Sequence, residues 1–344
     1  MGTFHPSLIA FGLLICCASN ARGDILQKRV KSAADLAKQA AKGDSKKYIE
    51  TFSAAIQGPE ALEGAKLADT LARKRNGALL SRNTPADSIY ENPRFRELYP
   101  ILIGDSAKGR RIFGGKPAKP GEFDACVAVG NDDRYYCSGT LIGKRLVCTA
   151  GHCFDEQPSR IFVGNSISNS GREYRIKSGG IIRHPAYHRG QSPHNDLTVL
   201  ILEEDVDGVS PMKIADSASS DAMKIVRIVG FGNTDKEGSV GYGTKNIADV
   251  VVVSPDGIRY NSLKYGADAG LEFVAEDRRA DSCTGDSGGP AFLEDGDTWK
   301  LTGATSRATL AASAECGDGG IYVRMDKYLP WIQRVARANH VDAP

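Results

Sequence analysis

The stretch "DSCTGDSGGP", residues 281–290, places Ser287 among three glycines. A serine that acts as a nucleophile needs an exposed hydroxyl, and it needs nearby backbone N–H groups that face the developing oxyanion. Glycine lets the backbone take that shape because it has no β-carbon. The stretch therefore predicts a nucleophile at Ser287. The alternative is a glycine-rich turn that carries an incidental serine.

A serine nucleophile needs a base, and the sequence offers six histidines. His152 stands out because it lies in "TAGHCF", beside two cysteines that would hold its loop in place. The base in turn needs a carboxylate that fixes its tautomer. Asp196 precedes the apolar run "LTVLIL", where a buried carboxylate requires a partner. His152, Asp196 and Ser287 are therefore the candidate catalytic residues.

The segment "GDSGG" also satisfies the GxSxG pattern of α/β-hydrolases. That fold requires its catalytic residues in the chain order Ser, Asp, His. In this sequence only His340 follows Ser287, and Pro290 stands where the helix after the nucleophile would begin. We therefore reject this alternative.

The chain changes composition at Arg111. Residues 112–344 hold 29 of the 38 glycines, and short β-branched runs such as "RIFVG" and "DVVVV" alternate with turn residues. This pattern predicts many short antiparallel strands that form a sandwich or a pair of barrels. The final stretch "DKYLPWIQRVARANH" predicts a helix that packs on the β core through Leu329, Ile332 and Val335.

Residues 24–111 predict a mainly helical prosegment, because they are rich in Ala, Lys and Gln and space their apolar residues at helical intervals. This part carries 17 basic and 11 acidic residues, whereas residues 112–344 carry 26 basic and 31 acidic residues. Opposite net charges favour contact between the two parts. The alternative is two solvated surfaces of opposite sign.

Residues 1–23 are expected to form a secretory signal peptide, since the apolar run at 8–17 is too short to span a bilayer. Six cysteines remain after this segment, and all lie beyond residue 111. In an exported protein six cysteines predict three disulfides. The sequence has no CxxC pair, which argues against a metal site, and its net charge of +2 gives no indication of nucleic-acid binding.

Five separated motifs resemble those of the chymotrypsin–trypsin family of serine endopeptidases. The resemblance covers residues 112–344, about two thirds of the chain. It implies two six-stranded antiparallel β-barrels, with the active site in the cleft between them, followed by a C-terminal helix. The motifs are "RIFGG" (111–115), "CSGTLIGKRLVCTAGHC" (137–153), "NDLTVL" (195–200), "DSCTGDSGGP" (281–290) and "GIYVRM" with "YLPWI" (320–332).

The resemblance implies a role for each candidate catalytic residue. His152 is the general base, Asp196 orients it, and Ser287 attacks the substrate. The backbone N–H groups of Gly285 and Ser287 form the oxyanion hole.

The resemblance also assigns five residues to the primary specificity pocket: Asp281, Ser282, Ser306, Ala308 and Gly320. Asp281 is placed at the floor, where a buried carboxylate favours substrates with Arg or Lys before the scissile bond. Beside Ser306 the family usually has a large apolar residue, whereas this chain has Arg307. We therefore expect a preference for acidic residues further upstream in the substrate.

For the cysteines the resemblance implies two disulfides. Cys137–Cys153 would brace the histidine loop, and Cys283–Cys316 would brace the specificity pocket. Cys126 and Cys148 are left over, and we expect them to form the third disulfide.

The stretch "GRRIFGG", residues 109–115, resembles the activation site of the family's zymogens. The resemblance implies cleavage of the Arg111–Ile112 bond, after which the new ammonium group at Ile112 pairs with Asp286. Because residues 24–111 contain no cysteine, we expect charge alone to hold the prosegment after the cut. The Asp281 pocket suits Arg111 itself, so either the enzyme or another protease makes the cut.

These features predict a secreted, monomeric serine endopeptidase that acts on protein or peptide substrates at Arg or Lys. We expect no cofactor, no metal ion, no nucleic acid and no membrane partner; residues 165–175 offer one acid, Glu173, too few ligands for calcium. The alternative is a catalytically silent homologue that acts as a binding or regulatory module. The presence of all three candidate catalytic residues argues against it.

Overall fold

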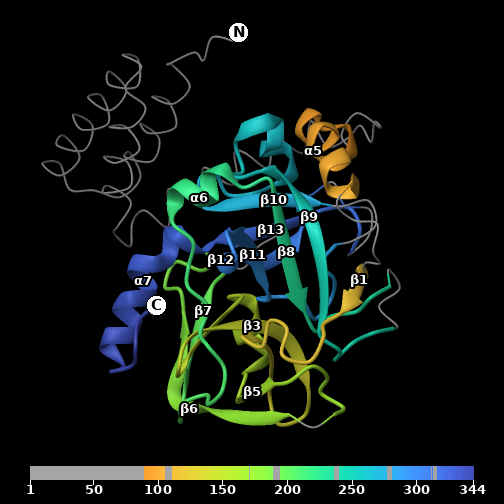
Figure 1. Cartoon of the computed structure of the whole chain (residues 1–344). Helices are drawn as coiled ribbons and strands as arrows, with labels where there is room; N and C mark the ends of the chain where they lie inside the picture. Colours follow the sequence, from red (N-terminus) through yellow and green to blue (C-terminus); the bar gives the residue numbers. More distant parts are fainter. Residues whose placement is uncertain are drawn as a thin grey trace, which may run out of the picture. The chain divides into compact units, whose positions relative to one another are not determined.

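The computed structural model describes residues 89–104, 111–169, 171–188, 194–235, 240–276, 281–310, 312 and 316–344 (Figure 1). The expected signal peptide and the prosegment up to residue 88 lie outside the described residues. The described part of the prosegment contains a 3₁₀ turn, η2 (Ile89–Glu91), and a helix, α5 (Pro93–Gly104). Both belong to one compact unit, Thr84–Pro344.

Six antiparallel strands close the first barrel. They are β2 (Cys126–Gly130), β3 (Tyr135–Gly143), β4 (Leu146–Thr149), β5 (Arg160–Val163), β6 (Arg172–Arg183) and β7 (Thr198–Leu202). The order is β2-β3-β4-β7-β6-β5, and β5 pairs with β2 to complete the ring. Alternate side chains of a strand point to opposite faces, so Val127 and Val129 of β2 enter the barrel interior.

Six further antiparallel strands close the second barrel. They are β8 (Ile225–Gly230), β9 (Asn246–Ser254), β10 (Glu272–Glu276), β11 (Pro290–Asp295), β12 (Thr298–Ala308) and β13 (Gly320–Arg324). The order is β9-β10-β13-β12-β11-β8, and β8 pairs back onto β9. A short strand, β1 (Arg111–Pro117), adds to β9 outside the ring. The prediction of two six-stranded antiparallel barrels is confirmed.

The C-terminal helix α7 (Met325–Ala338) packs where the two barrels meet (Figure 1). Its apolar face enters the same core cluster as β2 of the first barrel and β11 of the second. The predicted helix is therefore present, although Leu329 is only half-buried, and Tyr328 and Trp331 lie in the core instead. The remaining helical turns are η3 (His152–Glu156), α6 (Ser217–Ala222) and η4 (Arg259–Tyr265).

Among the described residues, no helix combines the length and the apolar composition that crossing a bilayer requires.

Two of the three expected disulfides are present, and the third is wrong. Cys137 is bonded to Cys153, and Cys283 is bonded to Cys316. Cys126 and Cys148 are free, buried thiols.

The strand register explains why Cys126 and Cys148 do not pair. Thr140 of β3 lies opposite Cys126 on one side and opposite Cys148 on the other, so the central strand separates the two cysteines. Two strand spacings place their Cα atoms about 10 Å apart. A disulfide requires Cα atoms roughly 4.4–6.8 Å apart.

Protein that lacks residues 1–23 should therefore release two free thiols on unfolding, and neither should react in the folded state. Cys126 and Cys148 are fully buried, and burial raises the pKa of each thiol to about 12, which suppresses the reactive thiolate. Titration with Ellman's reagent, without reductant, before and after unfolding in guanidinium chloride measures both states. Unfolded protein with no free thiol would contradict the structure.

Candidate active site

The loop that carries Ser287 ties the two barrels together. From the first barrel, the N–H of Ser138 donates to the carbonyl oxygen of Ser287 at 2.8 Å. On the second barrel, the N–H of Gly288 donates to Thr305 O, also at 2.8 Å. Gly288 has φ of +77°, and a β-carbon there would lie 2.1 Å from Thr149 Oγ1. Only glycine fits this contact between the barrels.

Two peptide N–H groups of the loop face away from the protein's own acceptors. The carbonyl oxygens of Thr284 and Asp286 each accept a backbone hydrogen bond, at 2.9 and 2.8 Å. Because a peptide is planar and trans, the N–H that follows each held carbonyl points to the opposite side. These are the N–H groups of Gly285 and Ser287, and within the described part of the chain neither donates to another group. Both are therefore available to an oxyanion.

Ser138 fixes the same loop, a function that the sequence analysis missed. Its buried hydroxyl donates to Gly285 O at 2.9 Å and accepts from the N–H of Phe231 at 3.0 Å. Ser138 lies inside the quoted motif "CSGTLIG", but nothing local distinguishes it from the polar residues of an ordinary strand. Its partners lie more than 90 residues away in the chain.

His152 and Asp196 meet at the start of η3. The N–H of His152 donates to Asp196 Oδ1 at 2.8 Å, and its Nδ1 lies 3.0 Å from Oδ2. Asp196 is fully buried, and the hydroxyl of Ser306 donates to its Oδ2 at 2.5 Å. The residue before it, Asn195, has φ of +51° and accepts a hydrogen bond from Tyr328 of α7. The C-terminal helix thus helps to hold the carboxylate loop.

The two partners shift each other's pKa in the direction that a general base requires. Burial lowers the pKa of His152, but the hydrogen bond and the charge of Asp196 outweigh it and hold that pKa above its usual value. Burial raises the pKa of Asp196, but hydrogen bonds from His152 and Ser306 hold it below its usual range. Nδ1 is thereby occupied, which leaves Nε2 to accept a proton. No described hydrogen bond joins Nε2 to Ser287 Oγ, a contact that often tightens only when substrate binds.

Of the residues predicted for the specificity pocket, Asp281 is held by backbone donors, whereas Ser306 contacts Asp196 instead. Asp281 is buried and accepts three backbone hydrogen bonds, from Ser282 (2.8 Å), Gly317 (2.9 Å) and Gly319 (3.1 Å). Burial raises the pKa of Asp281 to about 7, although these donors act to lower it. Ser306 does not face Asp281, since its hydroxyl bonds Asp196.

Two predicted pocket residues lie beside each other on neighbouring strands. Ala308, at the end of β12, pairs with Gly320, at the start of β13, and the connection between them carries Gly317 and Gly319, which donate to Asp281. Ser282 completes the group, and its hydroxyl lies 3.3 Å from that of Tyr322.

Asp286, the predicted partner of a new N-terminus, is buried against glycine backbone. Its Oδ1 accepts from the N–H of Gly232 at 2.8 Å, and its Oδ2 accepts from Cys283 at 2.9 Å. A β-carbon on Gly232 would lie 2.6 Å from the carboxyl carbon, so the loop needs glycine there. Burial raises the pKa of Asp286 to about 7. The side chains of residues 111–114 lie outside the described part of the structure.

Arg307 is not a free cation in the substrate cleft. Its two terminal nitrogens lie 2.7 Å from the two carboxylate oxygens of Glu272, and Nη2 also donates to Gly266 O at 2.9 Å. Nη1 donates to Ser306, the residue that bonds Asp196. The side chain of Arg307 is 12% exposed and that of Glu272 is 1% exposed. The expected acidic preference upstream in the substrate therefore loses its basis.

One cluster of the described residues has the geometry of metal ligands: Cys137, His152 and Cys153. The two sulfurs are bonded to each other, so neither is a thiolate that could hold a metal ion. The cluster instead anchors the histidine loop to β3.

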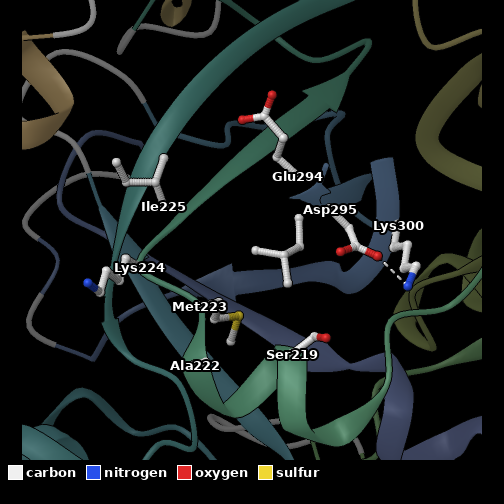
Figure 2. Close-up of a pocket in the computed structure, with 9 residues that line it drawn as sticks. Ser219, Ala222, Met223, Lys224, Ile225, Glu294, Asp295 and Lys300 are labelled. Carbon is white, nitrogen blue, oxygen red and sulfur yellow. Dashed lines mark ion pairs between the residues drawn. The ribbon is translucent and has the colours of Figure 1, made fainter. Parts of the chain in front are cut away.

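Away from these residues, a hollow lies on the outer face of the second barrel, between α6, the start of β8 and the β11–β12 hairpin (Figure 2). No histidine is among its described lining residues, and the hydroxyl of Ser219 donates to Asp216 at 3.1 Å. Figure 2 shows Lys300 paired with Asp295 at its edge, at 2.5 Å. Its described lining residues therefore offer no counterpart of the His152–Asp196 pair.

The barrels, the His152–Asp196 pair and the glycine-framed serine loop together define a serine peptidase site of the two-barrel type. Comparison with known proteins agrees: the sequence model of the trypsin family matches residues 112–332. That match covers more than half of the chain, which therefore belongs to the trypsin family and is a serine endopeptidase.

Three curated proteins are similar to this chain over about two thirds of its length. Transmembrane protease serine 5 of Homo sapiens is 28% identical over 248 residues, a match that covers 66% of this chain and 52% of that protein. The chain thus spans about half the length of this relative. Kallikrein-7 of Homo sapiens is 26% identical over 231 residues, covering 67% of this chain and 88% of the relative. Kallikrein-8 of Mus musculus is 27% identical over 237 residues, covering 66% and 87%.

Replacing Arg307 with Ala should destabilise the protein strongly, because the carboxylate of Glu272 would stay buried without its cation. Removing one partner of a buried pair costs about 3–5 kcal/mol. Urea unfolding followed by tryptophan fluorescence measures the loss. The exposed pair Arg134–Glu156 provides the control, and Arg134→Ala should change the midpoint little. Equal effects of the two substitutions would contradict the buried pairing.

Proposed function

We propose that this protein hydrolyses peptide bonds on the carboxyl side of Arg or Lys, through an acyl-enzyme on Ser287. The observation that carries the proposal is the hydrogen-bonded pair His152–Asp196, together with a serine loop whose Gly285 and Ser287 N–H groups are unengaged in the described structure. A catalytically silent homologue would not require all of these groups to be present in this arrangement.

In the proposed reaction, Ser287 Oγ attacks the carbonyl carbon of the substrate while its proton passes to His152 Nε2. The carbonyl oxygen becomes an oxyanion and accepts hydrogen bonds from the N–H groups of Gly285 and Ser287. The C–N bond then breaks, and the imidazolium gives its proton to the leaving amine. Water attacks the acyl-enzyme by the same route, which releases the carboxylic acid and restores Ser287.

Asp281 supports the Arg/Lys part of the proposal. Its carboxylate accepts only backbone hydrogen bonds among the described residues, and burial raises its pKa to about 7. The ionised form of Asp281 is therefore stabilised when the substrate brings a cation into the pocket. A guanidinium or ammonium group supplies that charge through charge-assisted hydrogen bonds.

Replacing Asp281 with Ser should lower kcat/KM on an arginine ester about 100-fold or more, because the substrate cation would be buried without its counter-charge. Steady-state kinetics on Arg and Phe esters measure the change, and the Phe ester should lose far less. Ser287→Ala serves as the catalytic blank, with kcat reduced by several orders of magnitude. An Asp281→Ser enzyme that cuts Arg esters at the original rate would refute the assignment of Asp281.

We further propose that the protein is secreted as a monomeric zymogen and activated by cleavage of the Arg111–Ile112 bond. Burial of Asp286 supports this proposal, since its carboxylate has backbone donors but no described cation beside it. The ammonium group of a new N-terminus at Ile112 would supply that charge. Residues 24–111 would be the prosegment, and residues 1–23 the signal peptide.

An Arg111→Gln variant should stay full-length and inactive, because the bond would lose its recognition residue and Asp286 its counter-ion. N-terminal sequencing, an arginine-ester assay and labelling by diisopropyl fluorophosphate measure the state of the chain and of Ser287. Full activity from the uncut variant would refute the zymogen proposal. A Ser287→Ala chain that stays intact indicates self-cleavage, whereas one that begins at Ile112 indicates another protease.

A further inference from the structure

The segment 89–104, which precedes the proposed cleavage site, is packed into the second barrel's outer surface. Figure 1 shows α5 beside β9. Ile89, Phe95 and Leu98 are at most 3% exposed. They share one apolar cluster with side chains of β9, β10, β13, η4 and the loop after η4, namely Val251, Val253, Val274, Ile321, Tyr265 and Ala267. Apolar burial of this kind does not depend on a peptide link between the two parts.

Polar contacts fix the register of this segment. Arg94 donates through Nε to Val252 O and through Nη2 to Met223 O, both at 2.9 Å. Its Nη1 donates to the hydroxyl of Tyr260 at 2.7 Å, and the guanidinium lies over the Tyr260 ring. Asn92 donates to the carbonyl oxygen of Tyr260 at 2.7 Å. The segment therefore has one docked position.

The first two residues of the segment contact the backbone that holds Asp281. The hydroxyl of Tyr90 lies 2.5 Å from Gly317 O and 3.1 Å from Glu276 Oε1, and it donates to the nearer carbonyl oxygen; the N–H of Gly317 donates to Asp281 Oδ2. Ile89 packs so closely on Gly319 that a β-carbon there would lie 2.8 Å from Ile89 Cδ1. The N–H of Gly319 is a second donor to the same carboxylate oxygen. Tyr90 and Ile89 thus contact Gly317 and Gly319, the two glycines that supply two of the three backbone donors to Asp281.

We propose that residues 89–104 stay bound after cleavage at Arg111–Ile112, as a second chain held without a disulfide, and that Tyr90 is a positioning residue for the Asp281 pocket. This inference rests on the proposed function, since it uses both the cut and the role of Asp281. It replaces the expectation that charge alone would hold the prosegment. Apolar packing and the bonds of Arg94 hold it instead.

The first experiment tests retention without relying on Arg111 as the natural site. A recognition sequence for a site-specific viral protease replaces residues 105–110 in a Ser287→Ala, Arg111→Gln chain. After the cut, size-exclusion chromatography with mass spectrometry should find the upstream fragment eluting with residues 111–344 at micromolar concentration. A fragment that separates completely would overturn the proposal.

Two substitutions on the same helix provide a matched comparison. Leu98→Asp places a charge in the apolar cluster, where Leu98 is 2% exposed, and should release the cut fragment. Ile101→Asp makes the same kind of change at a residue that is 49% exposed, and should leave the fragment bound. Retention unaffected by Leu98→Asp would contradict docking through this cluster.

The second experiment tests the positioning function of Tyr90. In the activated enzyme, Tyr90→Phe removes one hydroxyl and should raise the inhibition constant of benzamidine, an amidinium probe for the pocket carboxylate, about 3- to 10-fold. Labelling of Ser287 by diisopropyl fluorophosphate, which needs no pocket cation, should keep its rate. Tyr260→Phe removes a docking hydroxyl that accepts from Arg94 and should leave benzamidine binding unchanged. Equal benzamidine binding by the Tyr90→Phe and unsubstituted enzymes would overturn the positioning function.

A third measurement separates this inference from the proposed function. Hydrogen exchange of the amides at 317–320 should be faster in Tyr90→Phe than in the unsubstituted chain, whether or not the chain cleaves any substrate. If benzamidine fails to bind the unsubstituted enzyme, the Arg/Lys proposal is wrong, while retention and exchange still decide the docking. Unchanged exchange in Tyr90→Phe would overturn the contact between Tyr90 and the pocket backbone.

Discussion

The close contact between the first barrel and the serine loop is the constraint on which the rest of the site depends. Ser138 donates through its backbone N–H to the carbonyl oxygen of Ser287 and through its hydroxyl to Gly285 O. Gly288 makes room for this contact because no β-carbon fits against Thr149. The serine of one barrel is thereby held near His152 of the other. Neither barrel alone places the proposed nucleophile, the proposed base and the two proposed oxyanion donors together.

Buried carboxylates impose the second constraint, because an uncompensated charge in the interior is expensive. Asp196 and Glu272 are compensated by side chains, His152 with Ser306 in one case and Arg307 in the other. The two networks meet at Ser306, which accepts from Arg307 and donates to Asp196. The buried ion pair Arg307–Glu272, which lies outside the three candidate catalytic residues, therefore helps to support the carboxylate of Asp196. Arg307 supports the site through its hydrogen bond to Ser306, and its charge is paired with Glu272 rather than exposed to substrate.

The sequence was sufficient for the parts of the site whose information is local. The glycines around Ser287 and the apolar run after Asp196 predict the candidate functions of these residues within ten residues, and the resemblance of five motifs to the trypsin family implies the two barrels. Long-range register is not visible in the sequence: Thr140 lies between Cys126 and Cys148, which makes the third expected disulfide impossible. The partner of Arg307 is 35 residues away, and the docking partners of residues 89–104 lie more than 100 residues downstream. Residue type alone could not distinguish a paired arginine from a free one.

The loop of Ser287 places two buried carboxylates, Asp281 and Asp286, on either side of Cys283. Burial raises the pKa of each from 3.8 to about 7. A carboxyl group with a raised folded-state pKa adds stability below its unfolded value, and this contribution is lost as pH rises through about 7. At neutral pH the ionised loop is therefore less stable than a loop whose carboxylates have cations. In the proposed enzyme, the ammonium group of Ile112 supplies one cation and the substrate's Arg or Lys supplies the other. Until substrate arrives, Asp281 depends on the backbone N–H groups of Ser282, Gly317 and Gly319, and the proposed positioning function of Tyr90 acts through the backbone of Gly317.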